Sequence, residues 1–289
     1  MQSYAIGSRS VHRIGFGAMQ LPGPGVFGPP RDHDAAIAVL RRAVELGVDH
    51  IDTSQYYGPD VANALIREAL HPYPDGLVLV TKVGARRSEK GDWLPAQRPE
   101  ELRQGVEDNL RALGVEQLGA VNLRLLTELD ALPPDQQVAY EDQLGEMAAM
   151  RDEGKLAGIG ISTAPLAAVE HAIDAVGIVC VQNAFSLLDQ HDADVLDRCA
   201  ADGIAYVPYF PLGSAFPGMP KVTEDEAVGK VAARLGATPA QVGLAWLLAH
   251  RGNILLIPGT SSLAHLEENM ATGAVELTDA DIAELERGR

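Results

Sequence analysis

Cysteine is scarce in this sequence, with two residues in a chain of 289. Cys180 lies in an apolar run with strand character, Cys199 lies in a helical pattern, and no Cys-x-x-Cys pair is present. A disulfide framework is therefore not expected. Such cysteine usage is typical of a reducing compartment, and we expect a cytoplasmic protein.

Long apolar runs and basic charge are also lacking. Residues 1–10 contain no apolar signal core, and the longest apolar runs, such as Leu244 to Leu248, are far shorter than the roughly 20 residues of a membrane-spanning helix. Lysine and arginine number 23 against 40 acidic residues, which gives a net charge of −17. Because the acidic residues are scattered over the expected helix faces, the surface disfavours nucleic acid and anionic membranes as partners.

The sequence does contain a regular alternation of strand-like and helical segments. Its strand-like runs are apolar at nearly every position, as expected when helices cover both faces of a parallel sheet. Eight strands, each followed by a helix, predict a (β/α)8 TIM barrel with a short N-terminal β-hairpin, in a single domain spanning residues 1–289. The predicted strands cover residues 14–19, 48–51, 77–83, 120–126, 157–162, 178–183, 204–209 and 254–258, and the predicted helices cover 32–45, 61–70, 99–113, 137–151, 165–176, 193–201, 225–235 and 239–249.

A doubly wound open sheet is the alternative fold. Such sheets carry a glycine fingerprint after the first strand, and Gly23 to Gly28 does match G-x-G-x-x-G. However, Pro29 and Pro30 follow at once, and no helix begins on the glycines, where a pyrophosphate would bind. We therefore predict the closed barrel.

Polar residues gather where two neighbouring strands end. Asp52 and Tyr57 follow the strand at 48–51, and Lys82 lies at the end of the next strand. A buried lysine is costly without an acidic partner, so we expect Asp52, Lys82 and Tyr57 to meet at one mouth of the barrel. The alternative for Lys82 is an ordinary surface lysine. A nearby ammonium would lower the tyrosine pKa from about 10 by roughly one to three units and make Tyr57 a usable general acid.

His50 and Asp52 form a His-x-Asp pattern at the same strand end, which is a weak signal for a metal site. No second His-x-His pair or acidic cluster supplies the remaining ligands. We expect His50 to be a core histidine and predict no metal.

Six segments, in the correct order and over nearly the whole chain, resemble the aldo-keto reductase superfamily. The resemblance implies a nicotinamide-dependent reductase of small carbonyl compounds. In it Tyr57 donates the proton, Lys82 lowers the pKa of Tyr57, and Asp52 holds Lys82. The six segments are residues 50–58, 80–82, 158–162, 181–183, 209–213 and 257–269.

The chain departs from the family pattern at strand four, where Thr127 stands in place of the usual histidine. The histidine of the family helps to orient the substrate, so the resemblance does not say which group orients it in this chain. Our hypothesis is that the Thr127 hydroxyl has only a minor catalytic role. The departure also leaves open a second class of function, a nucleotide-binding sensor or regulatory protein with little turnover. A barrel hydrolase that uses a metal at the same mouth is a third class.

The same resemblance implies NADPH as the cofactor. Gly259 and His265 replace a lysine and an arginine of the family, which leaves fewer fixed charges for a 2′-phosphate, so NAD is the alternative. The residues implied to bind the cofactor are Ser162, Thr163, Gln182, Tyr209, Leu212, Ser214, Gly259, Thr260, Ser261, His265, Glu268 and Asn269.

Residues 15–32 and 121–124 are similar to a bacterial pyridoxal reductase branch of the superfamily, which implies pyridoxal as the substrate. The loop 84–97, with Arg86, Arg87 and Trp93, is expected to place an aromatic wall and positive charge over the barrel mouth. A solvated loop with one structural tryptophan is the alternative. We expect a monomer or a weak oligomer.

Overall fold

Seven parallel strands form the main sheet of the computed structural model, which describes residues 2–126, 132–213 and 220–289. Every residue of the third strand in this sheet, Val78–Val83, is buried, as the apolar runs predicted. The spatial order is β3-β4-β5-β8-β9-β10-β11. The strands are β3 (Phe16–Gly17), β4 (His50–Asp52), β5 (Val78–Val83), β8 (Ala120–Arg124), β9 (Ile159–Ser162), β10 (Cys180–Gln182) and β11 (Ala205–Tyr206).

An eighth extended segment closes the sheet on itself. Residues 254–256 pair in parallel with both edges, through bridges from Ile254 to Tyr206 and from Leu256 to Ile14. The closed (β/α)8 barrel that the eight apolar runs predicted is therefore confirmed, and the open sheet is excluded.

Arg13 strengthens this closure between the first and last units. Its side chain is buried, and its guanidinium donates hydrogen bonds to the carbonyl oxygens of Ile254 (3.0 Å), Leu248 (2.9 Å) and Arg251 (2.6 Å). One side chain at the start of the barrel thus holds three backbone groups around its final strand.

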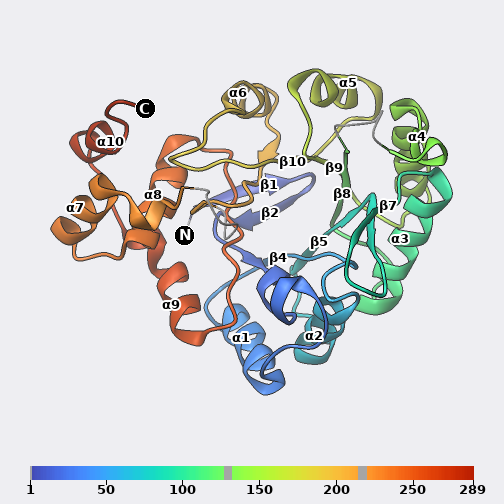
Figure 1. The fold of residues 1–289 in the computed structure, drawn as a ribbon, viewed down its shortest axis with the longest axis horizontal. Coiled ribbons are helices and arrows are strands. Elements are labelled where there is room, and N and C mark those ends of the chain that lie inside the picture. Colours follow the sequence, from blue (N-terminus) through green and yellow to red (C-terminus); the bar gives the residue numbers. More distant parts are fainter. Residues whose placement is uncertain (1, 127–131, 214–219) are drawn as a thin grey trace.

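Helices surround the barrel (Figure 1). Several of the residues that were predicted to begin or end helices do so in the structure. The Asp32 side chain caps α1 by accepting from the Ala35 amide at 2.9 Å, and Gly114 ends α3 in the left-handed region with φ of 70°. The helices are α1 (His33–Glu45), α2 (Val61–Leu70), α3 (Pro99–Leu113), α4 (Tyr140–Asp152), α5 (Leu166–Val176), α6 (Ala193–Ala201), α7 (Glu226–Leu235), α8 (Pro239–His250), α9 (Leu263–Ala271) and α10 (Asp279–Leu285). In the described part of the chain, none of them is both long and apolar enough to span a membrane.

The predicted N-terminal hairpin, β1 (Ser3–Ile6) and β2 (Arg9–His12), covers the end of the barrel at which the strands begin (Figure 1). Ile6 and Val11 are buried in one apolar cluster with barrel residues such as Val78 and Leu255. Burying side chains of this size stabilises the fold by about 1.5–3 kcal/mol each. Because this end is filled by apolar packing, the polar strand ends face the opposite mouth.

Candidate active site

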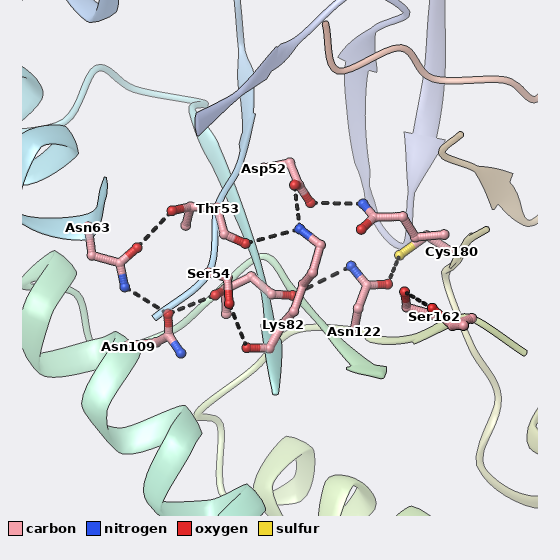
Figure 2. Close-up of polar contacts among 12 residues, drawn as sticks. Asp52, Thr53, Ser54, Asn63, Lys82, Asn109, Asn122, Ser162 and Cys180 are labelled. Atoms are coloured by element: carbon pink, nitrogen blue, oxygen red, sulfur yellow. Dashed lines mark hydrogen bonds and ion pairs between the residues drawn. The ribbon is translucent and has the colours of Figure 1, made fainter. Parts of the chain in front are cut away.

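A buried ion pair joins the ends of β4 and β5. Lys82 Nζ donates to Asp52 Oδ1 at 2.5 Å and to the carbonyl oxygen of Thr53 at 3.2 Å, as Figure 2 shows. The two charged side chains are only 8% and 5% exposed. The pairing follows from sheet register: Asp52 lies opposite Val80, so Lys82, two residues on, points to the same face. Lys82 is therefore not a surface lysine.

Gln182 satisfies the other oxygen of the same carboxylate. Its Nε2 donates to Asp52 Oδ2 at 2.9 Å, and the amide must face this way because the carboxylate accepts only. Gln182 Oε1 is left buried with no hydrogen-bond partner among the described residues. A buried, unpaired acceptor is costly, so this oxygen is suited to receive an N–H group from a ligand.

Tyr57 lies directly beside this pair, in the turn that follows β4. It is buried, and Lys82 Nζ is 5.1 Å from the centre of its ring. Asp52, Lys82 and Tyr57 are thus brought together, as the strand-end pattern predicted.

The expected effect of Lys82 on the pKa of Tyr57 is wrong. Burial, and after it the negative charge of Asp52, raises the pKa of the Tyr57 hydroxyl, while the Arg124 guanidinium opposes the rise. The Asp52 carboxylate, 2.5 Å from the Lys82 ammonium, offsets part of the positive charge that was expected to lower this pKa. Tyr57 therefore keeps its proton at neutral pH, as a proton donor must.

A network of buried amide and hydroxyl groups lies between the strands that carry the ion pair and the helices that cover them (Figure 2). Thr53 Oγ1 donates to Asn63 Oδ1 at 2.8 Å, and Asn63 Nδ2 donates to Asn109 Oδ1, also at 2.8 Å. Thr81 Oγ1 donates to the same Asn109 oxygen at 2.7 Å. The network joins β4 and β5, which carry the ion pair, to α2 and α3.

Sequence reasoning missed these two asparagines, although a signal was present. Asn109 shares a helix face with Val106 and Leu113, and Asn63 shares one with Ile66, at spacings of three or four residues. All five side chains are buried. A polar residue within an apolar helix stripe predicts a buried hydrogen-bond partner.

Ser162, Thr163 and Gln182 lie together where β9 and β10 end. Ser162 is buried, and its Oγ is 3.4 Å from Thr163 Oγ1. The amide of Thr163 donates to the carbonyl oxygen of Gln182 at 3.1 Å. Thr163 has φ of 59°, so the backbone is in the left-handed region and the chain turns sharply directly after β9.

The other residues near the expected nicotinamide position follow β11. The Tyr209 amide donates to the carbonyl oxygen of Asn183 at 3.0 Å, which fixes this segment beside the end of β10. The side chains of Tyr209 and Leu212 are half-buried. Ser214 and Thr127 lie outside the described residues.

Residues expected at the other end of the cofactor surround the start of α9. Gly259 approaches the first strand so closely that an added Cβ would lie 2.5 Å from the carbonyl oxygen of Gly17. Thr260 is buried and accepts a hydrogen bond from the Ser262 amide at 3.0 Å. Ser261 and His265 are exposed. Backbone amides and two exposed polar side chains therefore meet at a helix N-terminus, where anions are favoured.

Glu268 and Asn269 lie on α9 itself. Glu268 accepts a hydrogen bond from the hydroxyl of Thr238, the residue that caps α8, and its carbonyl oxygen accepts from Gln241 at 2.9 Å. Asn269 is buried. These contacts fix α9 against α8.

The segment 84–97 forms a hairpin, β6 (Ala85–Arg87) and β7 (Trp93–Pro95), where a loop was expected. Trp93 contacts Tyr56 edge-on with ring centres 5.2 Å apart, and Tyr56 contacts Tyr57 at 5.5 Å. The hairpin thus places an aromatic wall beside the ion-pair site, and Trp93 is not an isolated structural tryptophan.

Comparisons with known proteins agree with this geometry. The model of the Aldo/keto reductase family matches residues 13–288. The chain is 50% identical over 284 residues to pyridoxine 4-dehydrogenase of Escherichia coli (strain K12), covering 98% of this chain and 97% of that one. It is 37% identical over 281 residues to an uncharacterized oxidoreductase of Schizosaccharomyces pombe, covering 97% and 88%.

Solved structures share the fold over almost the whole chain. A thermostable aldo-keto reductase bound to the inhibitor epalrestat aligns with a TM-score of 0.82 at 25% identity, covering 99% of both chains. An aldo-keto reductase from Klebsiella pneumoniae in complex with NADPH aligns with a TM-score of 0.81 at 22% identity, covering 99% and 94%.

Proposed function

The chain belongs to the aldo/keto reductase family, and we propose that it uses NADPH to reduce a small aldehyde or ketone to the alcohol, with the reduction of pyridoxal to pyridoxine as the proposed reaction. Pyridoxal is proposed because the chain is 50% identical to an enzyme named for oxidising pyridoxine. We further propose one catalytic domain over residues 1–289, acting in the cytoplasm as a monomer or weak oligomer.

The observation that carries this proposal is the buried pair of Asp52 and Lys82 beside Tyr57. A buried ion pair contributes little to stability compared with well-packed apolar side chains, so stability does not account for its presence. Reduction of a carbonyl needs a proton donor with a cation close by, and this arrangement supplies both.

NADPH supplies the hydride when it is bound. The unpaired Gln182 Oε1 fits this cofactor, because a carboxamide N–H₂ group can donate to it. We assign Ser162 and Thr163 to the same carboxamide and Tyr209 to stacking on its ring. Solved barrels of the family hold NADP or NADPH, which supports the choice of cofactor.

For the far end of NADPH we propose Thr260, Ser261 and His265 as hydrogen-bond donors at the start of α9. Because Gly259 and His265 stand where the family has a lysine and an arginine, fewer fixed cations face a 2′-phosphate, and the preference for NADPH over NAD should be modest. Leu212, Ser214, Gly259, Glu268 and Asn269 complete the proposed set.

In the proposed mechanism Tyr57 donates its hydroxyl proton to the carbonyl oxygen of the substrate. The negative charge that then develops on the tyrosine oxygen is stabilised by the nearby cations, Lys82 and Arg124. Asp52 and Gln182 hold the Lys82 ammonium in place, and the buried surroundings keep water from competing for the proton. We assign Thr127 a minor role in orienting the carbonyl group.

The test follows NADPH absorbance with pyridoxal and a panel of other aldehydes. Tyr57→Phe should reduce kcat by about a hundred to ten-thousandfold, the usual contribution of a general acid. Tyr73→Phe is the matched control, because its hydroxyl bonds the carbonyl oxygen of Leu113 at 2.6 Å, in a different part of the fold. Equal rates for wild type and Tyr57→Phe would refute the mechanism. NADPH binding without turnover would favour the sensor function, and no binding would refute the cofactor.

A further inference from the structure

Two arginines and a tryptophan form a cluster at the mouth of the barrel, which we call the Trp93 cluster: Arg87, Trp93 and Arg124. The guanidinium carbon of Arg87 lies 4.2 Å from the centre of the Trp93 ring, and that of Arg124 lies 5.3 Å from it. Trp93 is nevertheless 48% exposed. Both cations are thus held against one ring that remains open to solvent.

Among the described residues neither arginine forms a direct ion pair with a carboxylate, although the charge of Asp92 acts on Arg87 and partly opposes the effect of burial on its pKa. Several arginines elsewhere form ion pairs, such as Arg103 with Glu146 and Glu153. By contrast, Arg87 donates to the carbonyl oxygen of Gly25 at 3.1 Å, and its Nε and Nη1 atoms are buried without a partner.

The cluster lies next to the proposed reaction site. Arg124 is the last residue of β8 and pairs in register with Ser162, which we assign to the cofactor. Its charge acts on the hydroxyl groups of both Tyr56 and Tyr57. The Trp93 ring contacts Tyr56, which contacts Tyr57. Arg124 is therefore close enough to Tyr57 for its charge to act at the site where a carbonyl group would meet the Tyr57 hydroxyl.

The two guanidinium groups that lie against the Trp93 ring repel each other, and an anion placed near both would offset this repulsion. Arginine presents a planar set of donors that matches the oxygens of a carboxylate or phosphate. Arg124 is half-buried and Trp93 is exposed, so the cluster offers an anion a cation at the surface of the barrel mouth.

We propose that the Trp93 cluster binds an oxyanion carried by the carbonyl substrate, a carboxylate or a phosphate ester, so that the enzyme prefers anionic aldehydes to neutral ones of the same shape. This inference rests on the proposed reductase function. Arg124 contacts the anion directly, and Trp93 and Arg87 hold Arg124 in position.

The test compares two aldehydes that differ in charge, para-carboxybenzaldehyde and its methyl ester. Wild type should show a kcat/KM about tenfold or more higher for the acid, the scale of one charge-assisted hydrogen bond. Arg124→Gln should bring the ratio of the two substrates close to one, and Arg124→Lys should retain part of the preference. Added salt should lower the wild-type ratio. Pyridoxal phosphate and pyridoxal form a second pair, which tells a phosphate site from a carboxylate site.

Arg9→Gln is the matched control. It removes the same charge from an exposed residue of the N-terminal hairpin, at the opposite end of the barrel, and should leave the ratio unchanged. Thermal melting of each variant checks that the fold is intact. An equal fall of kcat/KM for acid and ester in Arg124→Gln would overturn the proposal, as would a wild-type preference for neutral aldehydes in both pairs.

A binding measurement separates this inference from the reductase function. If wild type reduces no aldehyde, the reductase function fails, and calorimetry with para-(hydroxymethyl)benzoate and its methyl ester then decides the anion site alone. Tighter binding of the acid that is lost in Arg124→Gln would support the site. Equal binding of acid and ester would refute it.

Discussion

Gln182 on β10 donates a 2.9 Å hydrogen bond to Asp52 on β4, and three strands of the barrel wall separate the two residues. The bond therefore crosses the interior of the barrel. It fixes the Asp52 carboxylate from the side opposite its own strand while Lys82 fixes it from the neighbouring strand. The position of the Lys82 ammonium beside Tyr57 thus depends on both walls.

Removing one member of the ion pair should be more harmful than removing both. Lys82→Met leaves the Asp52 charge buried without its cation and should lower the free energy of unfolding by about 3–5 kcal/mol. The double variant with Asp52→Asn should recover much of that loss, although both proteins should be inactive. Urea denaturation of the four proteins in this cycle measures the coupling. Additive losses would show that the pair is not coupled.

The amide network behind the site should contribute to stability through Asn109. Asn109→Leu leaves the donors of Asn63 and Thr81 without their acceptor, at a cost of about 1–3 kcal/mol for each buried donor left unpaired. Gln104→Leu, on the exposed face of the same helix, is the control and should change stability little. Similar midpoints of urea unfolding for the two variants would contradict the assigned role of the network.

Acid stability should depend on Asp281. Hydrogen bonds from Thr278 and the Arg234 guanidinium lower the pKa of this carboxyl from 3.8 to about 2. A pKa lowered in the folded state stabilises the protein above the ordinary value, and that contribution is lost as the pH falls from about 4 to about 2. Melting temperatures measured across this range should therefore fall more steeply for wild type than for Asp281→Asn. Arg234→Gln should also flatten the curve, and parallel curves for all three proteins would refute the linkage.

Two glycine-to-alanine changes should have opposite effects. In Gly17→Ala the new Cβ would lie 2.5 Å from the carbonyl oxygen of Ile257, so the first and last strands must separate, at a cost of about 1–3 kcal/mol. In Gly145→Ala the new Cβ meets no atom within 4 Å, and the change should stabilise α4 by about 0.5–1 kcal/mol. Chemical denaturation compares the two directly. A Gly17→Ala protein as stable as wild type would show that the first and last strands can separate at this point without cost.

Most of the barrel could be predicted because its local signals agree with its long-range packing. Apolar runs indicated the strands, and capping residues such as Asp32 and Gly114 indicated helix boundaries. The β6–β7 hairpin was missed because its strands are short and carry Arg86, Arg87 and Trp93, without an apolar face. Helix α10 was missed although Thr278 begins a capping box there.

Contacts between residues on adjacent strands of the site could be predicted from the sequence. Contacts between residues on distant strands could not, because they depend on how the whole barrel closes. Asp52 and Lys82 end adjacent strands, so their pairing followed from sheet order. The bond between Gln182 and Asp52 crosses the barrel, and no local pattern indicates it. The pKa of Tyr57 was predicted in the wrong direction because the burial that raises it depends on the whole fold.

Because residues 254–256 close the barrel, the barrel cannot close during synthesis until these residues have been made. Until that segment leaves the ribosome, the strands at both edges of the sheet lack their last neighbour, and Arg13 lacks the carbonyl groups of Leu248, Arg251 and Ile254. Unpaired strand edges invite association with other chains. A nascent chain arrested before Asn253 should therefore depend on chaperones, whereas the finished chain should not.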